Sequence, residues 1–257
     1  SGASNNTHNV GVGYAAGYEL TTGSENTAVG AYSLYNSTTS ANNTALGYYA
    51  LNVNTTGAGN VAVGAYALDA NTTATGNTGV GYRAGTATTT GAQITAIGNE
   101  SLRTNTTGYA NVGLGCHSLY SCSTGHNNVA AGHNTLYYLT TGEDNTAVGN
   151  GAGQDLTTGD YNTLLGYEAG FNITTSQDHT CVGAYSGYTM TNQSHNTYIG
   201  SYSGYHQTNT GNTAVGYRAF TGTTTANGYS NTVMGYAAAQ DAQDGTNNST
   251  VIGYEAG

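Results

Sequence analysis

The chain has 257 residues, of which 3 are basic and 13 acidic, so its formal net charge is −10 at pH 7. Leu, Ile, Val, Phe and Met together number about 36, which excludes an ordinary globular core, while only 6% of residues are charged, which is atypical of disorder. This charge balance also excludes binding to nucleic acid through phosphates and electrostatic docking to an anionic membrane.

A phrase of the type Asn-Thr-Ala-Val-Gly returns along the whole chain. Its glycine recurs at a constant interval of 17, at Gly13, Gly30, Gly47, Gly64, Gly81, Gly98, Gly115, Gly132, Gly149, Gly166, Gly183 and Gly200. Three further copies end at Gly216, Gly235 and Gly253, with length changes around 206–211, 221–229 and 240–247 that indicate a loop side. The fifteen copies predict one repeat domain over residues 1–257.

The residues before each glycine predict a β-strand. Counting the glycine as position 0, position −1 is apolar in every copy, from Val12 to Ile252, and position −3 is Thr or Val. These positions share one face of a strand, and we expect that face to point into the core. Position −4 is Asn in twelve copies, and the exceptions are Ile94, His179 and Ser249.

A 17-residue unit is too short for two packed helices, and its glycines disfavour helix. The period predicts an all-β fold, a parallel β-solenoid (β-roll) of about 15 coils. Stacked coils place identical residues roughly 4.8 Å apart, so asparagine amides can form a ladder and glycines can stack closely. We expect this structural ladder to include Asn26, Asn43, Asn60, Asn77, Asn111, Asn128, Asn145, Asn162, Gly30, Gly47, Gly64 and Gly81.

The second half of the repeat carries one large apolar residue, at either of two positions. In most copies with Leu at position +4, as at Leu51, position +7 is small or polar, as at Asn54; in most copies with Gly at position +4, as at Gly153, position +7 is apolar, as at Leu156. The coil of Gly132 carries both, Leu136 and Leu139. The coils of Gly81, Gly200 and Gly235 carry neither. The exchange predicts a core volume shared by both positions.

Tyrosine is abundant at positions +1 and +2. One interpretation is an aromatic ladder that stacks coil on coil and keeps its hydroxyls in water. The other is a face that binds sugars or proteins. The tyrosines of position +2 that would form such a face are Tyr32, Tyr49, Tyr66, Tyr185 and Tyr202.

Residues for catalysis or metal binding show no suitable spacing. The acidic residues are scattered over different positions of the repeat, and Cys116, Cys122 and Cys181 are too few for a disulfide framework. His117 and His133 come from successive coils, where a stacked surface pair is expected before a metal site. We therefore expect no enzyme activity, catalytic residue, cofactor or metal.

The phrase Asn60-Val61-Ala62-Val63-Gly64, followed by Ala67, resembles the head repeats of trimeric autotransporter adhesins. It is also similar to repeats of bacteriophage tail-fibre proteins. The resemblance to the adhesins implies a left-handed parallel β-roll that trimerises at the tip of a surface fibre and binds matrix or cell surfaces.

These features predict a structural and adhesive fibre or filament subunit located outside the cell or on its surface. Its partners would be further copies of itself, in an end-to-end filament or a homotrimer, and cell-surface glycans or matrix proteins. End-to-end stacking would preserve the period, because four residues follow Gly253 and thirteen lead to Gly13. The alternatives are a tail-fibre shaft or receptor-binding protein of a virion and, because of the Thr columns, an ice-binding solenoid. No apolar stretch of about 18 residues and no signal peptide are found, so we expect no membrane insertion.

Overall fold

The computed structural model describes residues 8–222, 228–240 and 247–257. Its internal contacts divide the chain into two units, Ser1–Asn127 and Asn128–Gly257, which are described separately. The single domain over residues 1–257 stays a prediction. Among the described residues, no helix has the length and apolar character needed to span a membrane.

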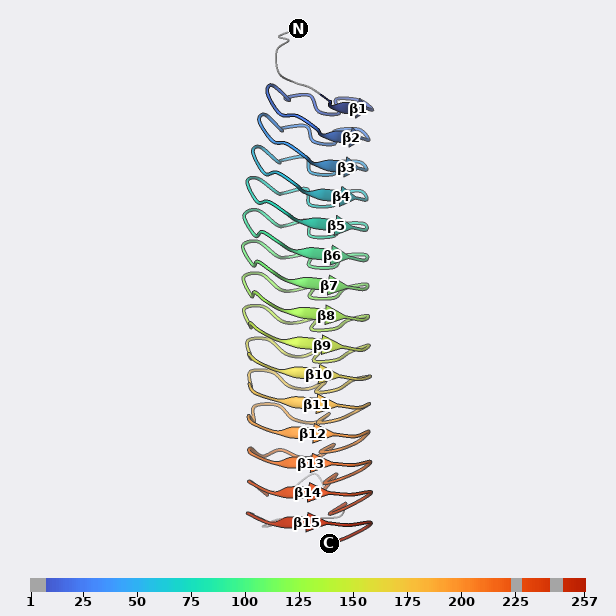
Figure 1. Cartoon of the computed structure of the whole chain (residues 1–257), viewed down its shortest axis with the longest axis vertical. Coiled ribbons are helices and arrows are strands. Elements are labelled where there is room, and N and C mark those ends of the chain that lie inside the picture. Colours follow the sequence, from blue (N-terminus) through green and yellow to red (C-terminus); the bar gives the residue numbers. More distant parts are fainter. Residues whose placement is uncertain (1–7, 223–227, 241–246) are drawn as a thin grey trace. The chain divides into compact units, whose positions relative to one another are not determined.

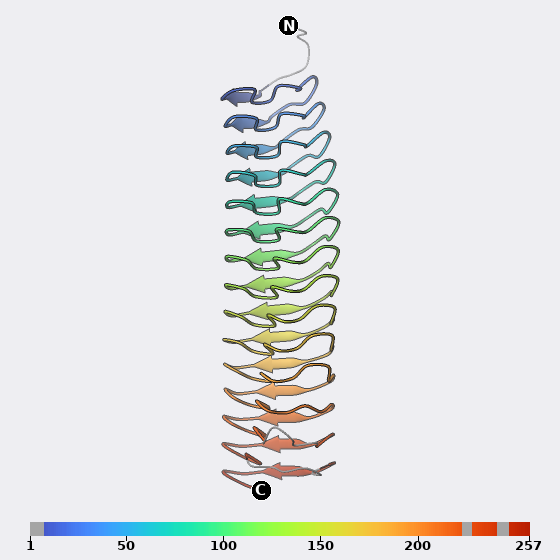
Figure 2. The ribbon, with the colours of Figure 1, turned by 180° about the vertical axis from the view of Figure 1, so that it is seen from behind.

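Each unit is built from three-residue strands joined by long irregular return segments (Figure 1; Figure 2 gives the view from behind). The first unit contains β1 (Val10–Val12), β2 (Thr27–Val29), β3 (Thr44–Leu46), β4 (Val61–Val63), β5 (Thr78–Val80), β6 (Thr95–Ile97) and β7 (Val112–Leu114). The second contains β8 (Val129–Ala131), β9 (Thr146–Val148), β10 (Thr163–Leu165), β11 (Thr180–Val182), β12 (Thr197–Ile199), β13 (Thr213–Val215), β14 (Thr232–Met234) and β15 (Thr250–Ile252).

Within each unit, every strand pairs in parallel with the next strand of the sequence, and equivalent positions face each other. In the first unit Val29 pairs with Leu46, and in the second Leu165 pairs with Val182. The return segments are also joined from coil to coil, since the Leu34 N–H donates to the Ala50 carbonyl over 3.0 Å. The predicted parallel β-solenoid with a 17-residue period is therefore confirmed.

The predicted direction of the strand face is wrong. Position −1 points outward, because Leu46, Ile97 and Ile199 remain 46%, 40% and 39% exposed, whereas position −2, for example Ala45, is fully buried. The interior is too narrow for a large side chain from most strands: a Cβ on Gly79 would already lie 2.9 Å from Cγ of Leu68. On most strands a small residue therefore faces inward at position −2, and the aliphatic residues of position −1 face outward with the Thr or Val of position −3.

The glycine column lies where neighbouring coils are closest. Gly81 has φ +134°, and a Cβ there would lie 2.7 Å from the carbonyl carbon of Gly98. The same close approach recurs at the other predicted glycines, Gly30, Gly47 and Gly64. A side chain at this position would force the backbones of two coils apart.

The asparagines of position −4 form the predicted buried ladder. Asn43 is representative: its backbone N–H and its side-chain Nδ2 both donate to Oδ1 of Asn26, at 3.0 and 3.1 Å, and Nδ2 also donates to the Gly57 carbonyl at 3.0 Å. Eight predicted members are all buried, namely Asn26, Asn43, Asn60, Asn77, Asn111, Asn128, Asn145 and Asn162. Each amide therefore holds the backbone of adjacent coils.

In most coils the exchange between positions +4 and +7 fills one core volume, as predicted, while the coil of Gly132 buries both Leu136 and Leu139. Leu51 and Leu156 are both fully buried although they come from different positions of the repeat. A Cβ on Gly170 would lie 2.6 Å from Cδ1 of Ile173, so the apolar residue of position +7 fills the space above the glycine. Two coils that lacked both residues are completed otherwise, by Ile94 against Gly85 and by Tyr198 against Gly204.

Candidate ligand-binding surfaces

One candidate surface is the outward side of the strands in each unit, which we call the strand face. It consists of positions −1 and −3. Its most exposed large apolar members are Val10, Val12, Leu46, Ile97 and Leu114 in the first unit, and Val148, Ile199, Met234 and Ile252 in the second. Position −1 is apolar in all fifteen copies even though it faces outward. A row of exposed apolar residues is typical of an interaction surface.

The predicted surface tyrosines of position +2 are half-buried and stack on one another within each unit. In the first unit the ring centroids of Tyr32 and Tyr49 lie 5.0 Å apart, and those of Tyr49 and Tyr66 lie 5.7 Å apart. In the second unit Tyr185 and Tyr202 are 5.0 Å apart. The aromatic ladder therefore exists, and its ligand-binding role stays a prediction.

A second aromatic column, which was not predicted from the sequence, lies at position +5. Tyr18 and Tyr35 stack in the first unit, with centroids 5.3 Å apart. Tyr188 and Tyr205 stack in the second unit at 5.1 Å, with planes only 6° apart. Tyr205 is also 5.5 Å from the ring of Tyr202, so the two columns join. The signal was in the sequence, because this second set of tyrosines recurs three residues after position +2.

The arginines lie over these rings, but their charges are balanced differently in the two units. In the first unit, Arg83 and Arg103 lie 3.7 and 3.6 Å from Oε1 of Glu100. In the second unit, the Arg218 guanidinium lies 5.8 Å from the Tyr202 ring centroid and 5.5 Å from that of Tyr217. No carboxylate in the described part of the chain forms an ion pair with Arg218.

A pocket of about 330 Å³ lies beside Arg218 in the second unit. Its lining residues are Tyr202, Tyr205, His206, Arg218, Thr221, Gly222 and Gln240. Backbone hydrogen bonds hold its wall, from the His206 N–H to the Thr221 carbonyl and from the Gly222 N–H to the Gln240 carbonyl, both 3.0 Å. Burial, and next the neighbouring Tyr202, raise the pKa of Tyr205, so its hydroxyl stays protonated at neutral pH.

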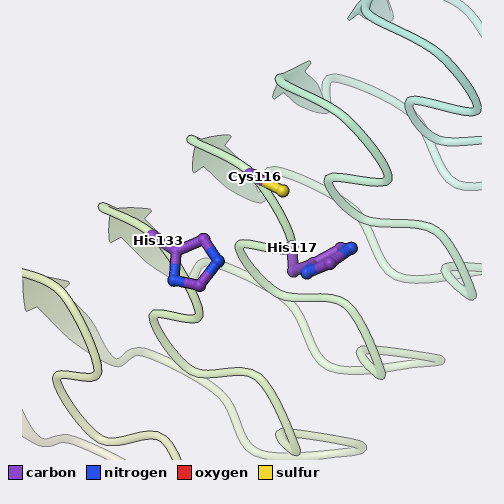
Figure 3. Close-up of side chains that lie close together, drawn as sticks. All are labelled: Cys116, His117 and His133. Carbon is purple, nitrogen blue, oxygen red and sulfur yellow. The ribbon is translucent and has the colours of Figure 1, made fainter.

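Figure 3 shows Cys116 and His117, which follow β7 in the first unit, and His133, which follows β8 in the second. Within the first unit, Nε2 of His117 lies 3.5 Å from Oε2 of Glu100. The expected stacking of His117 with His133 joins different units and stays a prediction. Cys116 and His117 by themselves do not supply the three or four protein ligands of a zinc site, and we assign no metal to them.

The cysteines are free thiols. Cys122 and Cys181 are buried, and burial raises the pKa of both thiols to about 12. A thiol that stays protonated is a poor nucleophile and a poor metal ligand. These two residues therefore act as small core residues at positions +7 and −2.

Comparison of the chain with protein-family models, curated proteins and solved structures finds no match.

Proposed function

We propose that the protein is a structural and adhesive fibre subunit that works outside the cell and associates side by side with further copies of itself through the strand face. The observation that carries the proposal is the apolar residue of position −1, exposed at Leu46, Ile97 and Ile199 and never replaced by a polar residue in fifteen copies. An isolated solenoid gains nothing from an exposed aliphatic row.

A second copy is the partner that fits this face best. The face repeats once per coil, at the strand spacing of about 4.8 Å. A surface with the same spacing can place an aliphatic residue opposite each of its members, and another copy of this chain has that spacing. The strand residues carry no charge, so like-charge repulsion does not oppose the contact. Among assemblies with a fixed number of copies, the resemblance to adhesin heads favours a homotrimer.

The adhesive role and the extracellular location rest on the resemblance of the Asn60–Gly64 phrase to adhesin and tail-fibre repeats and on the two aromatic columns. Stacked tyrosines such as Tyr185 and Tyr202 offer apolar ring surface with polar hydroxyls, which suits sugars and proteins alike. A virion tail fibre would use the same surfaces, and a particle-associated location would identify that alternative.

The association is tested by measuring molecular mass in solution. We expect the wild-type chain to sediment as a discrete oligomer, and the variants Leu46→Lys and Ile199→Lys to sediment as smaller species with unchanged circular dichroism. Val53→Lys is the matched control, because Val53 is also exposed but lies outside the strand face. A monomeric wild-type chain would refute lateral association, and open-ended polymers unaffected by both strand-face variants would favour end-to-end stacking instead.

A second candidate function, ice binding, is favoured by the threonines of position −3. Residues such as Thr27, Thr44 and Thr95 lie on strands and share the outward face with the aliphatic column. Regularly spaced hydroxyl and methyl groups on such a face could order water. Thermal hysteresis of a dilute solution tests the idea: coincident freezing and melting points in the wild-type protein would remove it.

A further inference from the structure

We propose that the pocket beside Tyr205 binds a sugar that carries a carboxylate, such as a hexuronic acid. The sugar ring would stack on Tyr205 and its carboxylate would pair with Arg218. This inference rests on the adhesive part of the proposed function and gives it a ligand class.

The pocket arises where the aromatic column of position +5 is interrupted. Phe171 stacks on Tyr188 at 5.4 Å, and Tyr188 stacks on Tyr205 at 5.1 Å. The next coil carries Thr221 at this position, so the column adds no further ring to Tyr205, and the ring of His206 lies edge-on to Tyr205 at 4.5 Å. Thr221 and Gly222 line the pocket there. Tyr205 thus lines a space in which the next ring of the column would lie.

A sugar ring is a suitable occupant of that space. The C–H face of a pyranose is apolar and can stack on a tyrosine ring, while its hydroxyls need polar partners at the rim. Gln240 supplies an amide that both donates and accepts, and His206 supplies a ring nitrogen. The volume of about 330 Å³ lies at the small end of ligand pockets and suits one sugar unit.

Arg218 sets the charge of the ligand. The chain has only three basic Lys or Arg side chains, and the other two, Arg83 and Arg103, lie close to Glu100. Arg218 has no such carboxylate among the described residues. Its guanidinium can donate two parallel hydrogen bonds to a carboxylate, a geometry that a neutral sugar cannot use.

The ligand preference is tested with a matched pair of sugars, methyl β-D-glucuronide and methyl β-D-glucoside, which differ only in the carboxylate at C6. Binding to the full chain is measured by NMR chemical-shift titration. We expect the glucuronide to bind about tenfold more tightly than the glucoside, the effect of one charge-assisted contact. Equal affinity for the two sugars would overturn the proposal. It would also be overturned if neither sugar bound at tens of millimolar and 50-fold molar excess, which is about the weakest affinity range that such a site would show.

Variants locate the site. Arg218→Gln should remove the preference for the glucuronide, and Arg83→Gln is the matched control that should retain it. Thr221→Tyr should abolish binding of both sugars, because it continues the stacked column with a residue that position +5 already carries at Tyr188 and Tyr205. Unchanged circular dichroism shows that each variant is folded. Undiminished binding by the Thr221→Tyr variant would contradict the assigned pocket.

Failure of this experiment is distinguishable from failure of the proposed assembly. The sedimentation test uses strand-face variants and needs no sugar, whereas the titration follows a pocket formed by the return segments. A chain that forms oligomers but shows no preference between the two sugars would retain the fibre role and lose only this ligand.

Discussion

The two units fill their cores from opposite positions of the same repeat. Most coils of the first unit use a leucine at position +4, as at Leu51 and Leu102, with a polar or small residue at position +7. Several coils of the second unit use glycine at position +4 and a large apolar residue at position +7, as at Leu156 and Ile173. In the first unit, the polar residues of position +7 bond to each other: Nδ2 of Asn71 donates to Oδ1 of Asn54 over 2.8 Å.

The difference shows which features the coil requires and which it can exchange. Both units keep the glycine of position 0 and an asparagine ladder with few substitutions, Ile94 in the first unit and His179 and Ser249 in the second. Core side chains are exchangeable because their volume can be supplied from two sites. Nothing else in the coil can replace main-chain stacking. We therefore expect side chains that push coils apart to lower the unfolding free energy more than changes of core residues do.

The largest effect is expected from adding a side chain to the glycine column, and it should be similar in both units. Gly81→Val would place atoms against the backbone of Gly98, and Gly183→Val would place a Cβ 2.6 Å from the carbonyl carbon of Gly200. Both glycines also have positive φ, which Val disfavours. We expect each variant to lose more than about 4 kcal/mol of unfolding free energy, measured by denaturant titration followed by circular dichroism.

The control for this prediction is Gly59→Asn. Gly59 also has a positive φ, +68°, but a Cβ there would meet nothing within 4 Å, and Asn42 occupies the equivalent position of the preceding coil at φ +60°. This variant should unfold within about 1 kcal/mol of the wild type, because Asn tolerates that backbone region. If Gly81→Val were equally harmless, close stacking of the coils would no longer explain the glycine column.

A smaller effect is expected from converting a first-unit core to the second-unit pattern. Leu102→Gly removes a buried side chain and should cost about 3 kcal/mol, reduced by the relief of positive φ at this residue. Asn105→Leu alone should also destabilise, because it places a second large side chain in a filled volume. The double variant should return to within about 1 kcal/mol of the wild type. Oδ1 of Asn105 has no hydrogen-bond partner among the described residues, but its Nδ2 donates to the buried Gly108 carbonyl over 3.0 Å, and the loss of this bond accounts for the remaining deficit of the double variant.

A double-mutant cycle measures this coupling directly. The expected coupling energy between Leu102 and Asn105 is favourable and about as large as the cost of one single substitution. Additive effects of the two substitutions would mean that the two positions do not share one volume, and the comparison between the units would then be a coincidence of sequence.

The exchange between positions +4 and +7, the glycine column and the asparagine ladder were all predictable because each repeats along the chain. The strand face was predicted wrongly because an alternating pattern identifies two faces but not which one is inside. The outcome depended on interior width, which only the stacked return segments define: Leu68 already fills the space that a side chain at Gly79 would need. The pocket at Arg218 could not be predicted either, because it depends on one interruption, Thr221, in a column that had not been recognised.

The smallest effect concerns the ladder substitution in the second unit and depends on pH. His179 takes the place of an asparagine: its Nδ1 accepts a hydrogen bond from the Asn196 N–H at 3.3 Å, and its Nε2 lies 2.6 Å from the Gln193 carbonyl, to which it donates. This arrangement needs a neutral imidazole with the proton on Nε2. Burial lowers the pKa of His179 to about 4.

The folded state therefore resists protonation while the unfolded chain takes up a proton near pH 6.5. The contribution of neutral His179 to the unfolding free energy is fully present above pH 6.5 and decreases as the pH drops toward 4. At pH 5 the unfolding free energy should be about 2 kcal/mol lower than at pH 7. His179→Asn is the matched variant, since asparagine occupies this position in twelve copies and does not titrate. Its unfolding free energy should lose this part of the pH dependence, and all other titrating groups cancel in the difference between the two proteins. If the wild type and the variant lost equal stability between pH 7 and pH 5, His179 would not be a neutral member of the ladder.

Because Ile94 interrupts the ladder of the first unit with a group that cannot titrate, hydrogen exchange at pH 5 should report faster opening around β11 than around β6 in the wild type only.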